Sequence, residues 1–455
     1  MNPLTAVYSP IYRNVVFPLY EGLRGRNTYR YLKENERRPF MSPKEIESLQ
    51  RRKLREVVRY AYEHTTFYRR LLDERGVAVE RVNGIEGLRD ADVWTSKETV
   101  REAGDDILSN EFSKNELHDT ATGVSTGKPV TFYMTFDEWT LKMAVKYRGE
   151  SWAGKPIGTP ATIIWGHDLK PNWFSWKKYL LYWRLQKYQF LSAFKVGDRD
   201  LVDYVRRIKR NGSKFLESYV TVVYNMALTI ERYGLKPPHL DGIIVGGERL
   251  YDFQKEKIEQ VFQCPVFNRY GCTEFSNVAH ECREHDGMHI NADRVVVEVV
   301  DDSGAPVYDE AGDIVITDLD SRAMPLIRYR IGDRGAMTKE RCRCGNNFPI
   351  LRNVVGRVSE VLVTPTGEQI HDLFFIWLLS RMPGVTRFKI VQTSVSELRF
   401  DLVHDGSVER DATVRFIEER LADLLDMGFH FSYNFVDEIP LTESGKMLYF
   451  VSQIR

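Results

Sequence analysis

Residues 120–129 are the stretch of the sequence best suited to binding a polyphosphate, because they combine hydroxyl side chains, two glycines and one lysine. Glycine lets the backbone turn its N–H groups toward an anion, and hydroxyl and ammonium groups supply further donors. Taken alone, the same composition fits an ordinary turn with a solvated lysine equally well. The candidate phosphate ligands in this loop are Ser125, Thr126, Gly127 and Lys128.

This loop differs from a Walker A loop, since Lys128 is followed by Pro129 rather than by serine or threonine. The residues after it, 130–134, are rich in β-branched and aromatic side chains and favour a strand over a helix. A phosphate loop between strands argues against the P-loop NTPases.

Two further motifs follow predicted strands. Gly247 and Glu248 follow the strand predicted at residues 242–245. Here the backbone can pass close to a flat ligand ring, at the carboxyl edge of the sheet where ligands bind. The next motif offers an aromatic face, a hydroxyl and a carboxylate that suits Mg²⁺. Its candidate residues are Tyr270, Gly271, Thr273 and Glu274.

Two motifs nearer the C-terminus carry one charged group each. Asp333 is predicted in a tight turn, where its carboxylate suits a bidentate hydrogen bond to a ribose diol, and Lys446 lies beside Gly445 in a flexible loop. Each of the five motifs also has a purely structural explanation, such as a turn, a core tyrosine or a solvated lysine. Five such motifs in one order are not expected by chance.

The overall composition is that of a globular protein: 455 residues, 43% hydrophobic and 28% charged. Lys plus Arg equals Asp plus Glu at 64 each, so no global field recruits nucleic acid or an anionic membrane. No apolar run is long enough to span a bilayer. Five cysteines, an odd number, favour a reducing compartment, and we expect the cytoplasm.

The elements that position these motifs follow from hydrophobic periodicity. Ser42 before Pro43 predicts a helix start, and apolar residues recur at helical spacing through residues 49–72, with Gly76 as a stop. The middle of the chain alternates predicted strands and helices, which indicates an α/β sheet with crossover helices. The predicted strands are 161–165, 242–245 and 266–267, and the predicted helices are 173–194, 198–210 and 253–262.

From residue 295 the pattern changes to strands and turns, with strands predicted at 295–300 and 312–316. The last hundred residues mix strands with a helix predicted at 413–425, which indicates a small α+β domain.

The order of the motifs resembles that of adenylate-forming enzymes of the acyl-CoA synthetase superfamily, within the phenylacetate–CoA ligase family and its CapK-like branch. Residues 54–62, 67–69 and 94–98 are similar to characteristic segments of that family, and the resemblance covers nearly the whole chain. It implies an α/β fold with a large N-terminal domain, which has a helical prefix and a β-rich subdomain, and a small mobile C-terminal α+β domain. The implied boundaries are 1–90 for the prefix, 91–355 for the ATP- and acyl-binding domain, and 356–455 for the small domain.

The resemblance implies ATP-dependent activation of a carboxylic acid through an acyl-adenylate, followed by transfer to coenzyme A. Loop residues 125–128 would clasp the β- and γ-phosphates, while Gly247, Glu248 and Tyr270 would flank adenine. Thr273 and Glu274 would lie at the phosphate and Mg²⁺. Asp333 would bind the ribose, Arg357 would contact the nucleotide at the domain hinge, and Lys446 would be the catalytic lysine.

Two alternatives stay open: a polysaccharide-biosynthesis protein with an acceptor other than coenzyme A, and a non-catalytic nucleotide-binding scaffold. The presence of Glu274, Asp333 and Lys446 favours the enzyme. The sequence does not identify the acid, although its aromatic content permits an aryl acid, and it leaves both a monomer and a homodimer open.

Three positions depart from the family pattern. Val124 stands where relatives carry another loop glycine, and Ser359 replaces the aspartate that usually follows the hinge arginine by two residues. Residues 361–367 lack the Arg-Gly-x-Asn pattern of phenylacetate–CoA ligases, so coenzyme A is less firmly implied than adenylation.

A Cys-x-Cys-Gly stretch at Cys342 and Cys344 resembles half of a zinc knuckle, and Cys282 lies near His285 and His289. Three cysteines and one histidine make a closed tetrahedral zinc site. Some members of the family carry structural zinc with this spacing, in which the later histidine is the ligand. This favours His289, with His285 as the alternative. The alternative is that no metal binds here and that these residues are three reduced thiols and two surface histidines.

Overall fold

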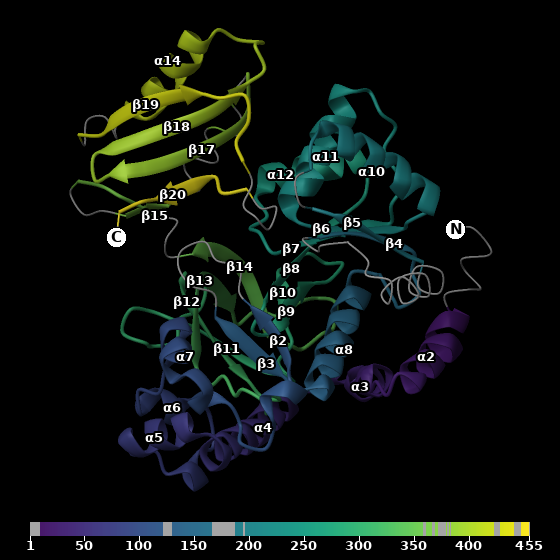
Figure 1. The fold of residues 1–455 in the computed structure, drawn as a ribbon, viewed down its shortest axis with the longest axis vertical. Coiled ribbons are helices and arrows are strands. Elements are labelled where there is room, and N and C mark those ends of the chain that lie inside the picture. The colour runs from purple at the N-terminus through teal and green to yellow at the C-terminus, as the bar shows by residue number, and fades with distance from the viewer. Residues whose placement is uncertain are drawn as a thin grey trace.

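The computed structural model describes residues 10–121, 130–165, 187–193, 196–357, 361–365, 369–371, 379, 382, 384–422, 428–440 and 447–454. Within these ranges a 12-stranded mixed sheet forms the body of the N-terminal part, and a separate four-stranded sheet forms the C-terminal domain, from residue 361 onward (Figure 1). None of the described helices is long and apolar enough to cross a bilayer.

Helices dominate the first hundred residues, as predicted. Ser42 caps the longest helix through a reciprocal capping box, because its hydroxyl accepts from Glu45 N at 3.3 Å and the Glu45 carboxylate accepts from Ser42 N at 2.7 Å. The helical elements here are a π-turn (Tyr12–Val16), α2 (Phe17–Leu23), α3 (Thr28–Asn35), α4 (Pro43–His64), α5 (Thr66–Glu74), α6 (Ile85–Asp90) and α7 (Lys97–Ala103), with 3₁₀ turns at Arg38–Phe40, Val79–Arg81, Gly104–Ile107 and Lys114–Glu116.

Thr65 divides the apolar pattern of residues 49–72 into two helices. Its hydroxyl donates to Ala61 O at 2.8 Å and accepts from Tyr68 N at 3.1 Å, so one side chain ends α4 and caps α5. Gly76, the predicted end of the helical region, adopts φ +64°. Glycine reaches this left-handed conformation at little energetic cost because it has no β-carbon.

The parallel half of the main sheet runs in the order β8-β7-β6-β4-β5. Helices α10 to α12 cover one face and α8 lies on the other (Figure 1). The strands are β4 (Ala161–Trp165), β5 (Tyr188–Ser192), β6 (Phe215–Ser218), β7 (Gly242–Gly246) and β8 (Val266–Cys272), and the helices are α8 (Phe136–Trp152), α10 (Asp198–Asn211), α11 (Val220–Arg232) and α12 (Asp252–Phe262). The α/β alternation predicted from the sequence is confirmed.

The helix predicted at residues 173–194 is wrong where the structure describes it. Residues 188–192 form β5, which pairs in parallel with β4 and buries Tyr188 and Leu191. Its partner strand supplies the backbone hydrogen bonds that favour an extended conformation over the helix expected from its aromatic and basic neighbours. Residues 166–186 and 194 of that prediction lie outside the described part of the chain.

The other half of the sheet is antiparallel, in the order β11-β12-β13-β14-β10-β9, and joins β8 through β9. A two-residue strand, β1 (Thr95–Ser96), pairs in parallel with β13. The strands are β9 (Ser276–Glu281), β10 (Met288–Ile290), β11 (Val295–Val300), β12 (Gly312–Asp318), β13 (Tyr329–Thr338) and β14 (Ile350–Arg357). This arrangement agrees with the strands predicted after residue 295.

The C-terminal domain has the predicted α+β composition. Its sheet has the order β19-β18-β17-β20, and a hairpin, β15–β16, precedes it. The elements are β15 (Val361–Val363), β16 (Gln369–His371), β17 (Val385–Ser394), β18 (Glu397–His404), α14 (Arg410–Arg420), β19 (His430–Phe435) and β20 (Phe450–Ser452). Helix α14 begins earlier than the helix predicted at 413–425, and residues 423–427 lie outside the described ranges.

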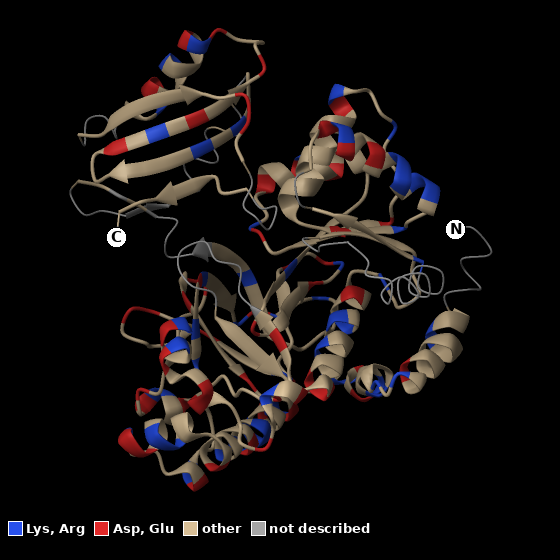
Figure 2. Ribbon diagram, in the orientation of Figure 1, with Lys and Arg blue, Asp and Glu red and all other residues tan. Residues whose placement is uncertain are grey.

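Charged residues of both signs occur along helices α4 to α7, α10 and α12 (Figure 2), in agreement with the formal net charge of zero. The exception to this surface distribution is α8. On this helix charged side chains lie on the buried side, including Lys142, Arg148 and Glu150.

Arg148 forms a bidentate ion pair with Asp293, with N–O distances of 2.7 Å for both contacts. Its guanidinium also donates to Asn291 Oδ1 and to Asn35 O. Both charged side chains are nearly inaccessible, at 3% and 1% exposure. Burial alone would raise the pKa of Asp293, but Arg148, with Lys53 and Arg38 nearby, lowers it to about 2.

We expect Asp293→Asn to lower the free energy of unfolding by about 3 kcal/mol, because it leaves a buried guanidinium without its counter-charge. The pKa of Asp293 is about 2 in the folded state and about 3.9 in the unfolded chain. The stabilisation by ionised Asp293 is therefore complete when the pH lies above the unfolded value. It is lost only as the pH falls toward 2. The difference between variant and wild type, measured by urea denaturation, should therefore stay constant from pH 8 to pH 5.

The matched control is Asp313→Asn, which removes a half-exposed carboxylate 3.8 Å from Arg334. Such surface pairs contribute about 0–1 kcal/mol. Equal losses in the two variants would contradict a special role for the buried pair.

Candidate functional site

The hydroxyl of Tyr270 on β8 donates a 2.8 Å hydrogen bond to Asp333 Oδ2 on β13, which joins two of the predicted nucleotide-binding residues. Tyr270 is 9% exposed. Burial, together with the Asp333 carboxylate, holds the pKa of Tyr270 well above its usual value, so its hydroxyl stays a neutral donor. The pair fixes the orientation of the carboxylate predicted to bind ribose.

The structure corrects the setting of Asp333, which lies inside β13 rather than in a turn between elements. Gly332, directly before Asp333, adopts φ +82° and makes the strand locally irregular. The Gly-Asp pair therefore looks like a turn when only the sequence is considered. In the antiparallel register Asp333 lies opposite Arg357 on β14. The backbone of the predicted hinge arginine therefore adjoins the predicted ribose site.

Glu274 lies in the turn after β8, and its carboxylate accepts from Tyr329 OH at 3.3 Å. Thr273 precedes it in the same turn and is partly buried. Gly271 is required by close packing, since a β-carbon there would lie 2.2 Å from Ser276 O. The motif at residues 270–274 is thus held as a compact corner between two strands.

Lys142 on α8 is a buried cation at this corner that the sequence did not indicate. Its ammonium donates to Glu274 O at 3.0 Å, and burial, followed by the nearby Arg294 guanidinium, lowers the pKa of Lys142. Glu138, one turn earlier, accepts backbone N–H groups of Arg322 and Ala323 and so fixes the start of α8. Glu138 also forms a capping box with Thr135, three residues earlier, whereas no sequence motif marks Lys142, because its partner lies 132 positions away.

Gly247 adopts φ +77° and packs closely on an aromatic ring, since a β-carbon there would lie 3.0 Å from Tyr219 Cε1. Glu248 next to it accepts two backbone N–H groups, that of Thr221 at 2.7 Å and that of Met447 at 3.2 Å. These contacts give Glu248 a role that the sequence did not indicate. It connects the start of α11 to the residue that follows Lys446.

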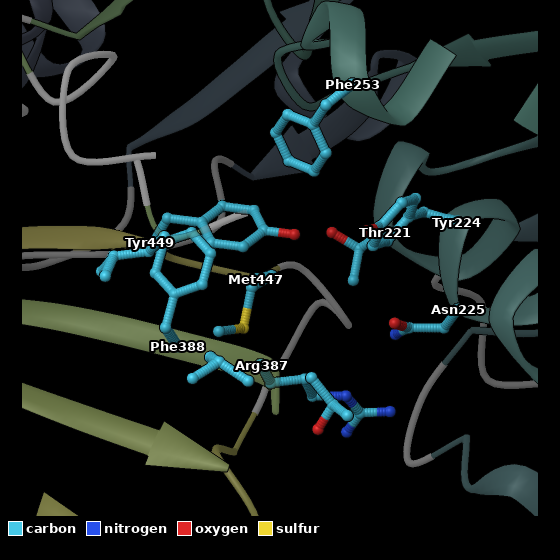
Figure 3. A pocket seen from close by; sticks show the side chains of 11 residues that line it. Thr221, Tyr224, Asn225, Phe253, Arg387, Phe388, Met447 and Tyr449 are labelled. Atoms are coloured by element: carbon cyan, nitrogen blue, oxygen red, sulfur yellow. The ribbon is translucent and has the colours of Figure 1, made fainter. Parts of the chain in front are cut away.

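A small cavity of about 30 Å³ lies beside this contact, between the two parts of the chain. Figure 3 shows side chains of Phe388, Met447 and Tyr449 from the C-terminal domain facing helices α11 and α12. Across the interface, Gln254 Nε2 donates to Tyr449 OH at 3.2 Å. The C-terminal domain is therefore docked next to the carboxyl edge of the main sheet.

The predicted loop residues 125–128 and Lys446 lie outside the described residues, and so does the side chain of Arg357. The strands that flank the loop are described: β2 (His118–Ala121) and β3 (Thr131–Met134) form an antiparallel hairpin. The expectation that this segment joins two strands, rather than opening a helix, is confirmed.

We expect Glu248→Gln to weaken the docking of the C-terminal domain, because a glutamine keeps one acceptor oxygen where the carboxylate uses two. Loss of one charge-assisted hydrogen bond should accelerate amide exchange at Met447 by about tenfold in hydrogen-exchange measurements. The control is Glu256→Gln, an exposed residue of α12, which should leave exchange at Met447 unchanged. Identical exchange in both variants would contradict the bridge.

The four predicted zinc ligands meet at one place, where the end of β9, β10 and the β13–β14 connection converge. The donor atoms of Cys282, His289, Cys342 and Cys344 all lie within 4.8 Å of one another. The Sγ atoms of Cys282 and Cys342 are 3.6 Å apart, and Cys344 Sγ is 3.3 Å from His289 Nε2. A tetrahedral zinc site with metal–sulfur bonds of about 2.3 Å has donor separations of about 3.8 Å, so these atoms fit the ion.

The surroundings also suit a metal. Backbone N–H groups of Glu284 and Asn346 donate to the Cys282 and Cys344 sulfurs at 3.5 and 3.4 Å, which favours thiolates. His289 Nδ1 lies 3.5 Å from Phe348 O and leaves Nε2 directed at the cysteines. His285 is instead stacked on the Phe267 ring, so of the two histidines left open by the sequence it is His289 that lies with the cysteines.

Comparison with known proteins adds a second line of argument. Residues 362–453 match the family model described as the CapK C-terminal domain. Protein CapK of Staphylococcus aureus is 21% identical over 446 residues, covering 95% of this chain and 94% of the relative. The chain is a homologue of CapK and of the phenylacetate–coenzyme A ligases. Among the latter, the Thermus thermophilus protein is 25% identical over 88% of this chain and 95% of its own length.

Solved structures agree on the fold. A 2-hydroxyisobutyryl-CoA ligase in its postadenylation state, in complex with R3-HIB-AMP, gives a TM-score of 0.76 at 20% identity and covers 92% of this chain and 91% of that one. The same ligase in its thioesterification state, with 2-HIB-AMP and CoA, gives 0.64 at 20% identity and covers 92% of both chains. This homologue of CapK therefore has the fold of the adenylate-forming ligases.

Proposed function

We propose that this CapK homologue activates a carboxylic acid with ATP and transfers the acyl group to coenzyme A. The observation that carries the proposal is the corner formed by Tyr270, Asp333 and Glu274, next to which the C-terminal domain docks through Met447. The homology to phenylacetate–coenzyme A ligases supports it.

In the first step a substrate carboxylate oxygen forms a bond to the α-phosphorus of ATP. The bond between that phosphorus and the α,β-bridging oxygen breaks, and pyrophosphate leaves with the electron pair. In the second step the coenzyme A sulfur bonds to the acyl carbon, AMP leaves, and the thiol proton is released. Charge builds on phosphate oxygens in the first step, so fixed cations and donors supply the catalysis.

The chain's own residues take the following roles in this proposal. Asp333, oriented by Tyr270, binds the ribose hydroxyls; Gly247 and Tyr270 flank adenine, and Glu248 holds the loop that carries Lys446. Glu274 and Thr273 hold Mg²⁺ and phosphate, with Lys142 fixing the Glu274 backbone. The loop of Ser125, Thr126, Gly127 and Lys128 clasps the terminal phosphates, Arg357 contacts the nucleotide, and Lys446 acts at the α-phosphate.

The CapK-like resemblance of the sequence implies the alternative of a place in polysaccharide biosynthesis, where a hydroxyl or amine would accept the acyl group in place of coenzyme A. Assaying release of AMP from preformed acyl-adenylate distinguishes the acceptors, because only a true acceptor accelerates it. A cytoplasmic location, which keeps thiols reduced, accords with three cysteines at one site.

We expect Lys446→Ala to reduce acid-dependent ATP–pyrophosphate exchange by about a hundred- to a thousandfold, because it removes a cation aimed at developing charge. ATP affinity should change little, since the groups proposed to bind adenine and ribose lie in the other part of the chain. Lys389→Ala in β17 is the control and should retain exchange. Exchange at the wild-type rate in Lys446→Ala would show that the lysine is misassigned.

We further propose that Cys282, His289, Cys342 and Cys344 bind one structural zinc ion, because their donor set and spacing fit it. Metal analysis of protein purified without chelators should find one zinc per chain. Cys344→Ala should lose the metal and lower the midpoint of thermal unfolding rather than selectively reduce adenylation. Cys264→Ala, at a buried cysteine outside the cluster, should keep the metal. Absence of zinc from the wild type would refute the assignment.

A further inference from the structure

Helix α8 and the main sheet enclose a group of five charged side chains, which we term the α8 charge cluster: Lys146, Glu150, Lys155, Glu217 and Arg269. Lys155 lies 2.6 Å from Glu150 and 2.7 Å from Glu217. Lys146 lies 2.6 Å from Glu150 and 3.2 Å from Glu217. The Arg269 guanidinium is farther from both carboxylates, at 3.9 and 3.4 Å.

Three cations thus share two carboxylates, which leaves one surplus positive charge among the described residues of the cluster. Burial disfavours charge on each member, yet the neighbouring cations lower the pKa of Glu217 and the carboxylates raise the pKa of Lys155, so both remain ionised. His280, opposite Arg269 in the sheet, adds no charge, because burial lowers its pKa to about 4. A buried surplus charge is costly unless a partner offsets it.

The exposures within the cluster show from which side that partner must come. Glu150, Lys155 and Glu217 have side-chain exposures of 1% or less. Lys146 and Arg269 keep 21% and 13%. Solvent therefore meets the two cations first, while both carboxylates lie behind them. This edge of the cluster is suited to an anion.

The cations adjoin the proposed adenylation site. Arg269 directly precedes Tyr270, and neighbouring side chains of a strand point to opposite faces of the sheet. Tyr270 contacts Asp333, whereas Arg269 contacts the residues on the α8 side. The Arg269 guanidinium also lies 5.5 Å from the ring of Trp165, which stacks on Tyr219 at 4.2 Å.

Trp165 ends β4 and Gly247 directly follows β7, and Arg269 on β8 pairs with Gly246, the last residue of β7. The three residues therefore lie near the edge at which open α/β sheets bind ligands. An acid placed there would meet an aromatic surface and, beside it, the exposed ends of two cations. The activated carboxylate itself must face the nucleotide on the Tyr270 side, so it cannot also be the anion that Lys146 and Arg269 bind.

We propose, on the basis of the proposed function, that the acid activated by this protein carries a second anionic group, which Arg269 and Lys146 bind. A dicarboxylic acid whose body packs against the partly exposed Trp165, which is backed by the buried Tyr219 ring, fits these groups. Lys146 and Arg269 are then determinants of substrate specificity, whereas Lys155 holds the two glutamates in place.

The experiment measures ATP–pyrophosphate exchange with acids matched in shape: phenylacetate against 4-carboxyphenylacetate, and butyrate against glutarate. In the wild type, kcat/KM should be at least about tenfold higher for the dianionic member of a pair, because the neutral end of the other member leaves the surplus positive charge of the cluster without a counter-ion. Arg269→Gln should lower kcat/KM about a hundredfold for the dianionic acids and much less for the others. Lys146→Met should change the preference in the same direction.

Thermal unfolding separates this role from a structural one. If Arg269 served only to balance the glutamates, Arg269→Gln would destabilise the protein; as a surplus cation, its removal should leave the midpoint unchanged or raise it. Arg232→Gln, at an exposed arginine of α11 paired with Asp198, is the control and should alter neither exchange nor preference.

Exchange with the monoanionic acids in preference to their dianionic partners would overturn the inference and leave the proposed function standing. Equal losses for both members of each pair in Arg269→Gln would also overturn it. Absence of exchange with every acid, in protein that still binds ATP, would refute the proposed function and the inference with it.

Discussion

Helix α8 is held against the main sheet by paired charges, and the proposed site depends on this constraint. Most helices that cover a sheet bury an apolar face, but α8 buries Glu138, Lys142, Arg148 and Glu150. Each removal of charge from water costs several kcal/mol, so each group must find a partner with good geometry. The helix therefore has few alternative positions, because a shift of one turn would break every pair at once.

This constraint links distant parts of the chain. Arg148 connects α8 to Asp293 and to the end of α3. Lys142 connects it to the corner that carries Glu274, and the α8 charge cluster connects it to the strands that carry Trp165 and Arg269. The low dielectric of the interior strengthens these interactions, so the groups proposed to meet ATP and the acid are held in fixed relation before either binds.

The C-terminal domain is attached in a different way. The polar contacts described between it and the helices of the main sheet include Glu248 with Met447 and Gln254 with Tyr449, around a small cavity. Such limited contacts favour a domain that can undock, which two successive half-reactions at one site require. The Cys282–His289–Cys342–Cys344 cluster, in contrast, brings together residues that all belong to the large sheet and its connections.

Local sequence patterns determined most of the elements: the helix start at Ser42, the strands at β4 and β7, and the order of the motifs proposed to bind the nucleotide. They also supplied the three cysteines and the histidine that the structure brings together at residues 282, 289, 342 and 344. The reason is that caps, alternation and turn chemistry act over a few neighbouring residues, and those are visible in the sequence itself.

Only the tertiary structure decided the features that depend on remote partners. It made residues 188–192 a strand beside β4, placed Asp333 inside β13 and brought His289, rather than His285, to the three cysteines. It also brought together Lys146, Glu217 and Arg269, although residues 146 and 269 are 123 positions apart in the sequence. A buried charge takes its meaning from its neighbours in space, and no local pattern specifies those neighbours.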